Sequence, residues 1–271
     1  MKKRNLLVIW FLILICFTCT SSLVLATPLS LDQNIKAVLA QQAESSEGFD
    51  FVVTGDSRDG AEVYERLLNR ARAFKPLFIL NTGDIVGTGR PFEYESYREQ
   101  IASYDIPILH LPGNHDVLFG EKTFHTYIGE SNWYFDLGGF RIIGLDNATG
   151  KFSAETVAFA RKTIPSQKIC LVAFHMPPAI GRWAAHAMTD NEETGHWGEV
   201  MDLIKKARVP MVLLGHIHLY DEMDIDGTKY IISAGGGARL YDKYNFGKIE
   251  YGFVLVQVRP NGITHRWVPL D

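Results

Sequence analysis

Six side chains with the chemistry of metal ligands follow short apolar runs in this sequence. They are two carboxylates, one amide and three imidazoles: Asp56, Asp84, Asn114, His175, His216 and His218. These donors suit borderline divalent or trivalent ions such as manganese, iron or zinc. One shared carboxylate could hold two ions about 3.5 to 4 Å apart, where both the attacking and the leaving oxygen of a phosphoryl group are stabilised. The bridging role is predicted for Asp84, at a central strand end.

The tetrapeptide Gly113-Asn114-His115-Asp116 adds a second kind of chemistry, because it places an imidazole beside the amide ligand. It follows an apolar run at residues 106–111 and a Pro-Gly turn, as expected at the carboxyl edge of a parallel sheet, where open α/β proteins bind ligands. Taken alone, Asn-His-Asp after Gly is ordinary turn chemistry. Any single Gly-Asp can be an ordinary turn, and any single strand-end His can be an ordinary surface or core residue. Only their joint occurrence in this order favours a metal site.

The elements that must position these residues begin with a βαβ pattern. Apolar runs at 49–53 and 77–80 predict strands, and the helical spacing of residues 61–74 predicts a helix between them. A second helix, 92–104, leads into a third strand at 106–111. Three parallel strands would then end in Gly-Asp, Gly-Asp and Gly-Asn-His-Asp.

The second half of the chain predicts a hairpin followed by further strands and helices. The hairpin strands are 133–137 and 140–146, joined by Gly138-Gly139. The later elements are a helix at 154–163, a strand at 169–174, a helix at 198–207 and a strand at 210–214. Three apolar segments, 230–234, 253–258 and 263–268, are expected to close an antiparallel half. Residues 179–197 have no clear period and predict a lid or substrate loop.

The first 26 residues differ from the rest. Three basic residues precede an apolar run at 6–17 and a small-residue end, which is the pattern of a signal peptide cleaved after Ala26. An uncleaved membrane anchor is the alternative, because residues 6–26 are just long enough to span a bilayer. Residues 27–48 predict a tether or a short helix, and 49–271 the functional domain. The protein is therefore expected to be exported, with membrane contact only through an uncleaved N-terminal segment.

Composition and charge narrow the function classes. The chain has 271 residues, 46% of them hydrophobic, which favours one large domain over two small ones. The leader holds three of the 27 basic residues and no acidic residue, so the remaining chain, with 31 acidic residues, carries a formal charge of −7. No basic stripe compensates, which argues against nucleic acid as a partner. Cys170 is the single cysteine after the leader, so no internal disulfide can form there.

The ordered motifs resemble those of the calcineurin-like metallophosphoesterases, in an exported bacterial-type form. Two Gly-Asp pairs, Gly-Asn-His-Asp, a lone His and Gly-His-Ile-His are spread over residues 55–218. The resemblance implies an α/β fold, a four-layer αββα sandwich of two mixed β-sheets flanked by helices. It assigns Asp56, Asp84 and His218 to one metal ion, and Asp84, Asn114, His175 and His216 to the other.

The resemblance also implies catalytic roles. His115 would lie beside the phosphate as a general acid or as a stabiliser of charge, while a metal-bound hydroxide attacks phosphorus in line. Asp116 would orient that imidazole through its second nitrogen, and a turn-capping Asp is the alternative explanation.

Position 58 departs from the family pattern. The family usually shows Asp-X-His in its first motif, and here the third residue is Arg58, whose guanidinium has no lone pair for a metal. The Tyr that replaces this ligand in purple acid phosphatases is also missing, because Gly87 stands there. The first site could therefore bind metal weakly. Arg58 could reach the substrate phosphate, or it could pair with Asp59 or Glu62 and position the turn.

These observations favour a secreted hydrolase, a phosphatase or phosphodiesterase that depends on two divalent or trivalent metal ions. The alternative is a non-catalytic or weakly active binding protein on the same fold, because Arg58 replaces a ligand. A third, weaker alternative is an exonuclease-type enzyme, against which the acidic charge argues. Substrate specificity is expected in residues 117–132 and 179–197.

Overall fold

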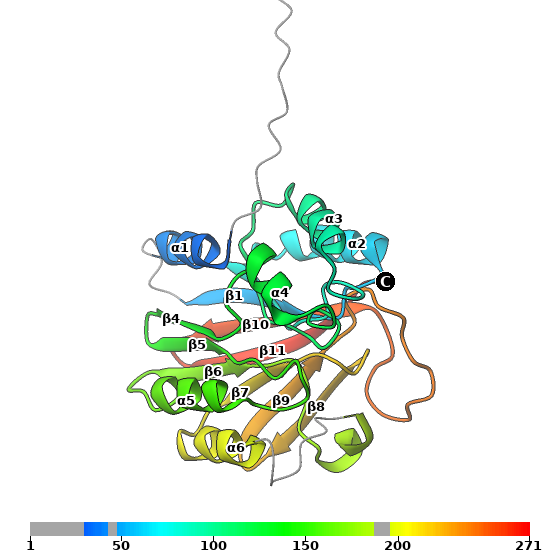
Figure 1. The fold of residues 1–271 in the computed structure, drawn as a ribbon. Coiled ribbons are helices and arrows are strands. Elements are labelled where there is room, and N and C mark those ends of the chain that lie inside the picture. Colours follow the sequence, from blue (N-terminus) through cyan, green and yellow to red (C-terminus); the bar gives the residue numbers. More distant parts are fainter. Residues whose placement is uncertain (1–29, 43–47, 187–195) are drawn as a thin grey trace, which may run out of the picture.

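The computed structural model describes residues 30–42, 48–186 and 196–271. They form two mixed β-sheets packed face to face, with helices on both outer faces (Figure 1). The predicted four-layer αββα sandwich is confirmed. The signal-peptide prediction for residues 1–26 and the 187–195 part of the loop prediction for 179–197 fall on residues outside the described ranges. Within those ranges, no helix combines the length and the apolar character needed to cross a membrane.

The first sheet has five strands in the order β11-β10-β1-β2-β3. Their bounds are β1 Phe49–Thr54, β2 Phe78–Asn81, β3 Ile108–His110, β10 Gly252–Arg259 and β11 Gly262–Pro269. The first three run parallel, as the βαβ pattern predicts, and β10 pairs antiparallel with both β1 and β11. Helices α2 (Ala61–Arg72) and α3 (Pro91–Ile101) connect the parallel strands and cover the outer face (Figure 1).

The second sheet has six strands in the order β4-β5-β6-β7-β9-β8. Their bounds are β4 Trp133–Leu137, β5 Phe140–Gly144, β6 Ile169–Ala173, β7 Met211–Leu214, β8 Tyr220–Ile225 and β9 Thr228–Ser233. The hairpin β4-β5 forms as predicted. Helices α5 (Ala154–Thr163) and α6 (Trp197–Lys206) cover the face turned away from the first sheet (Figure 1).

Three apolar cores separate the four layers. Phe51 and Phe78 of the first sheet meet Leu213 and Ile231 of the second in the central core. Val52 points the other way, into the core beneath α2 and α3. Because alternate side chains of each central strand enter two different cores, these strands read as continuous apolar runs. This burial holds the carboxyl ends of β1, β2, β6 and β7 at fixed positions.

The prediction that segments 230–234, 253–258 and 263–268 form one antiparallel half is wrong, because they belong to different sheets. The segment at 230–234 lies in β9, which pairs in parallel with β7 in the second sheet, whereas β10 and β11 pair in the first. The antiparallel partner of β9 is β8, which the sequence analysis missed because this edge strand is largely polar and only partly buried. β8 lies at the edge of its sheet, where charged side chains such as those of this strand are common.

Three short helical segments complete the described chain. Residues 31–42 form α1 (Leu31–Gln42), and its Leu31 and Val38 side chains join the central core. The segment 117–132, expected to carry substrate specificity, contains α4 (Glu121–Tyr127). The start of the predicted lid forms a 3₁₀ helix, Gly181–His186, whose buried Trp183 donates its indole N–H to Asp221 at 2.7 Å.

Candidate metal centre and active site

The strand ends of the two sheets converge as the sequence predicts. Asp56 and Asp84 follow β1 and β2, while His175 and His216 follow β6 and β7. The backbone of three of them is left-handed, with φ values of 58° at Asp56, 55° at Asp84 and 73° at His216. Such values are uncommon outside glycine, and their clustering is typical of functional sites.

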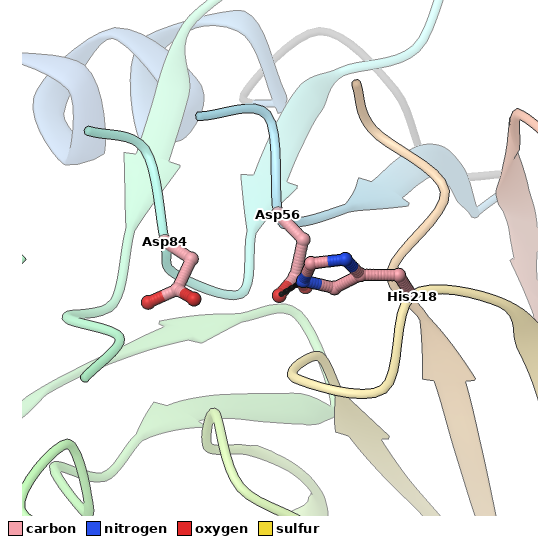
Figure 2. Close-up of side chains that lie close together, drawn as sticks. All are labelled: Asp56, Asp84 and His218. Carbon is pink, nitrogen blue, oxygen red and sulfur yellow. Dashed lines mark ion pairs between the residues drawn. The ribbon is translucent and has the colours of Figure 1, made fainter. Parts of the chain in front are cut away.

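The first predicted ligand set is the most compact. One ligand atom from each of Asp56, Asp84 and His218 lies within 4.8 Å of the others, and all three residues are buried (Figure 2). His218 Nε2 is 3.5 Å from Asp56 Oδ1. Burial alone would raise the pKa of Asp56, but the hydrogen bond to His218 and the nearby imidazoles outweigh it, so this pKa is lowered. The ionised carboxylate is the form that binds metal.

The second predicted set shares Asp84 with the first. His175 Nε2 lies 3.2 Å from Asn114 Oδ1 and 3.5 Å from Asp84 Oδ1. The His216 ring stands against the His175 ring, with centroids 5.1 Å apart. Burial, and then the neighbouring His175, lowers the pKa of His216 to about 3. His216 therefore stays neutral and keeps a lone pair for coordination.

Backbone carbonyls fix the orientation of three imidazoles. The Nδ1 atoms of His115, His175 and His218 lie 2.7, 2.8 and 2.7 Å from the carbonyl oxygens of Gly87, Thr82 and Arg239. A carbonyl oxygen can only accept, so each Nδ1 carries the proton. The Nε2 atoms of His175 and His218 then face other candidate ligands, at 3.2 Å from Asn114 Oδ1 and 3.5 Å from Asp56 Oδ1, as in metal sites whose histidines are held by a second hydrogen bond.

The predicted contact between Asp116 and His115 is wrong, because the partner of His115 Nδ1 is the Gly87 carbonyl. The buried Asp116 carboxylate instead accepts backbone N–H groups of Asp84, Ile85, Val86 and Gly113 at 2.8 to 3.0 Å. It ties the loop after β2 to the loop after β3. The turn-capping alternative describes its contacts better.

Arg58 lies beside Asp84 of the first ligand set. Its Nη1 donates to Asp59 Oδ2 at 2.9 Å, which matches the turn-pairing alternative for Asp59, and its Nε lies 3.5 Å from Asp84 Oδ2. Only 15% of the side chain is exposed. The guanidinium thus faces a predicted bridging carboxylate.

Asn147 is a structural part of the site that the sequence analysis missed. Its Oδ1 accepts the backbone N–H groups of His175 and Met176, both at 3.0 Å, and its Nδ2 donates to the Met176 carbonyl. Residues 147–149 match a glycosylation sequon, but Asn147 is 1% exposed, so its side chain is not accessible for glycosylation. Its place just after β5, at the same sheet edge, was the available signal.

Two cavities adjoin these loops. One, of about 590 Å³, lies between α2 and α3 and is lined by residues next to the site, among them Ser57, Asp59 and Gly87. The other, of about 390 Å³, includes Glu121, His125 and Ser131 of the 117–132 segment, together with Asp146. The second cavity is thus lined in part by 117–132, one of the two segments in which substrate specificity is predicted.

Comparison with known proteins agrees with this geometry. The family model for calcineurin-like phosphoesterases matches residues 49–220. The chain belongs to this family. The match takes in the ends of β1, β2, β3, β6 and β7, which carry the candidate ligands of both sets.

Two curated relatives of this calcineurin-like phosphoesterase carry the names of phosphodiesterases. A probable glycerophosphodiester phosphodiesterase GpdQ of Arcobacter nitrofigilis is 28% identical over 162 residues, which cover 53% of this chain and 57% of that protein. The 3',5'-cyclic adenosine monophosphate phosphodiesterase CpdA of Escherichia coli K12 is 27% identical over 185 residues, which cover 63% and 65%. The chain thus spans less than two thirds of these relatives.

Solved structures share the fold. The purple acid phosphatase PPD1 from yellow lupin seeds superposes with a TM-score of 0.66 over 83% of this chain and 52% of that one, at 16% sequence identity. A dimetal phosphatase from Danio rerio gives a TM-score of 0.58, covering 83% and 98% of the two chains at 13% identity. At these identities the likeness concerns the fold alone.

Proposed function

We propose that this chain is a metal-dependent phosphoesterase that hydrolyses a phosphodiester. The carrying observation is the orientation of the imidazoles. Carbonyl acceptors hold the Nδ1 protons of His115, His175 and His218, so that three Nε2 atoms are left for coordination and catalysis. The diester is the first choice because GpdQ and CpdA are named as phosphodiesterases.

The predicted ligand sets have donors that fit hard or borderline ions. Asp56, Asp84 and His218 form one group, and Asp84 is shared with Asn114, His175 and His216. Bound manganese, iron or zinc would supply Lewis acidity toward the phosphoryl oxygens and a water of lowered pKa. The ligands would hold these ions at the junction of the two sheets.

His115 is the proposed proton donor to the leaving oxygen. Its backbone N–H donates to Asp84 Oδ1 at 2.9 Å, which fixes the residue beside the shared carboxylate. With its Nδ1 proton held by Gly87, His115 carries a proton on Nε2 only as the doubly protonated imidazolium, and this Nε2 proton is the one it would give to the leaving oxygen. The partly exposed ring is open to a substrate, unlike the fully buried His175.

The direct test measures metal content together with hydrolysis of bis(p-nitrophenyl) phosphate and of p-nitrophenyl phosphate with manganese, iron and zinc. We expect His115→Ala to lower turnover of the diester by about 10²- to 10⁴-fold while metal content stays unchanged. His265→Gln, on β11, is the matched control because its ring pairs with Glu222 and lies on another element. Full activity of His115→Ala would contradict the proposed role.

A non-catalytic binding protein is the second candidate, because Arg58 stands beside Asp84 in place of a ligand. It predicts phosphate-ester binding without turnover under every metal condition. Turnover that is abolished by a chelator and restored by one of the metals would exclude it.

We also propose export through the N-terminal segment, on the sequence pattern of residues 1–26. The N-terminus of the protein recovered from outside the cytoplasm should then be residue 27. Intact-mass measurement distinguishes this form from an uncleaved anchor, and a full-length protein confined to the cytoplasm would contradict export.

A further inference from the structure

Arg58 brings a permanent positive charge into the group of residues best arranged to hold a cation. Its Nε lies 3.5 Å from Asp84 Oδ2 and has no hydrogen-bond partner, although the atom is buried. Asp84 is one of the three residues whose ligand atoms lie within 4.8 Å of one another. The guanidinium therefore interacts with this carboxylate by charge and proximity.

The position of Arg58 is fixed from several sides. Its backbone N–H donates to the Asp84 carbonyl at 3.0 Å, and its Nη1 donates to Asp59 at 2.9 Å. Asp59 has a left-handed backbone with φ of 60°, which turns the chain so that the neighbouring side chains meet. With 85% of its side chain covered, Arg58 has little freedom to leave the carboxylates.

The charges of Asp56, Asp84 and Arg58 favour a single cation next to the two carboxylates. The Asp56 and Asp84 side chains are almost completely buried, so their negative charge needs a nearby positive partner. A guanidinium is charged at every accessible pH and donates no lone pair. A metal ion entering among Asp56, Asp84 and His218 would meet this fixed charge across a few ångströms of poorly screened space.

We propose that the Arg58 guanidinium is the resident cation of the Asp56, Asp84 and His218 group. The chain then holds one tightly bound ion, on Asp84, Asn114, His175 and His216. This inference rests on the proposed function, because it concerns how the same site is charged. In this proposal the Arg58 guanidinium takes the place of a metal ion. Asp56, Asp84 and His218 become a metal site only when Arg58 is substituted.

The test counts metal ions. Metal-free protein is dialysed against a small excess of Mn²⁺, and the manganese bound per chain is then measured by elemental mass spectrometry. We expect about one ion per chain in the wild type and about two in Arg58→His, because the imidazole removes the charge and adds a ligand. Arg66→His makes the same exchange at a half-exposed position on α2 and should leave the count at about one.

Two second-site variants locate the ions. His218→Ala should remove the added ion from Arg58→His and leave the wild-type ion in place, whereas Asn114→Ala should weaken the wild-type ion at least about 10-fold. The electron paramagnetic resonance spectrum of bound Mn²⁺ gives an independent reading. It should be that of an isolated ion in the wild type and that of a coupled pair in Arg58→His.

The wild-type count alone can overturn the inference, even if Arg58→His fails to fold. Two ions of similar affinity in a wild-type protein that hydrolyses the diester would overturn the role of Arg58 and leave the proposed function standing. No bound ion and no turnover would overturn the proposed function, and this inference with it.

Discussion

At the scale of single residues, Asp116 shows how one side chain can organise a site without facing the substrate. Its two carboxylate oxygens accept four backbone N–H groups from two loops, and its own carbonyl accepts the Tyr94 hydroxyl at 2.6 Å. Burial and then the charge of Asp84 raise the pKa of Asp116. The backbone donors are therefore essential to compensate for the cost of burying this carboxyl group.

We expect Asp116→Asn to lower the free energy of unfolding by about 2 to 4 kcal/mol, because an amide nitrogen would face two backbone donors. Urea unfolding of the metal-free protein measures this change. Tyr94→Phe is the matched control, since it removes only the bond to the Asp116 carbonyl and should cost about 1 kcal/mol. Equal losses in the two variants would contradict the organising role of the carboxylate.

At the scale of elements, the loops after β2 and β3 approach each other so closely that only glycine fits. A Cβ on Gly113 would lie 2.2 Å from Asp84 Oδ1 and 2.3 Å from the Asp84 backbone nitrogen. The Gly-Asn-His-Asp motif thus needs its glycine for the contact with Asp84, in addition to any need of the turn.

Gly113→Ala should separate the two loops, lower metal affinity at least about 10-fold and cost about 1 to 3 kcal/mol in stability. Calorimetric titration with Mn²⁺ and urea unfolding measure the two effects. Gly139→Ala provides the control, because a Cβ at this hairpin glycine would meet no atom within 4 Å. Unchanged metal affinity in Gly113→Ala would show that the loops can move apart without consequence.

A buried hydrogen-bond chain connects the helices to the same strands. Asn81 at the end of β2 donates to the Tyr64 hydroxyl, which meets the Tyr97 hydroxyl, which in turn lies 2.9 Å from His110 Nε2. Burial, and then the charge of Arg98, lowers the pKa of His110 to about 3. This series of hydrogen bonds therefore depends on a neutral His110 imidazole at the end of β3.

We expect His110 to make the protein acid-sensitive. The unfolded chain binds a proton at this residue below pH 6.5, whereas the folded chain does so only near pH 3, so stability is lost as the pH falls through this window. The loss is about 1.4 kcal/mol per pH unit. Urea unfolding of metal-free wild type and His110→Gln at about pH 7 and about pH 5 measures it. Parallel pH dependence in the two proteins would contradict this assignment.

At the scale of the whole molecule, the candidate site joins the two sheets. Asp56, Asp84 and Asn114 come from the first sheet, and the three histidines of the ligand sets come from the second. Direct bonds already cross the junction, including His216 N–H to Asp56 at 2.9 Å and His175 Nδ1 to the Thr82 carbonyl at 2.8 Å. A bound ion would add a further link between the sheets.

Metal should therefore stabilise the entire fold. At a free concentration of about 100 times Kd the gain is about 2.7 kcal/mol, which for a chain of this size raises Tm by roughly 5 to 10 °C. Scanning calorimetry with manganese and with a chelator measures the shift. His175→Ala should show little shift, and a Tm independent of metal in the wild type would argue against a site shared by the sheets.

The amino-acid sequence by itself determined the parallel strands, their connecting helices and the residues at their ends. Residues 49–53 and 77–80 carry enough apolar character to predict buried strands, and the Asp that follows each can be read directly. The polar edge strand β8 and the short α4 could not be predicted in this way, because neither has a strong apolar period. Their form depends on the neighbours that they pack against.

Only the tertiary structure decided how the site residues are paired. Apart from Gly113, the backbone partners of the His115 and Asp116 side chains are about 30 positions away, at Gly87 and residues 84–86, and no local pattern encodes these contacts. The same holds for Arg58, whose substitution is visible in the sequence but whose proximity to Asp84 is not. Strand periodicity is a local property, whereas hydrogen bonds and charge pairs between loops depend on how the two sheets are packed.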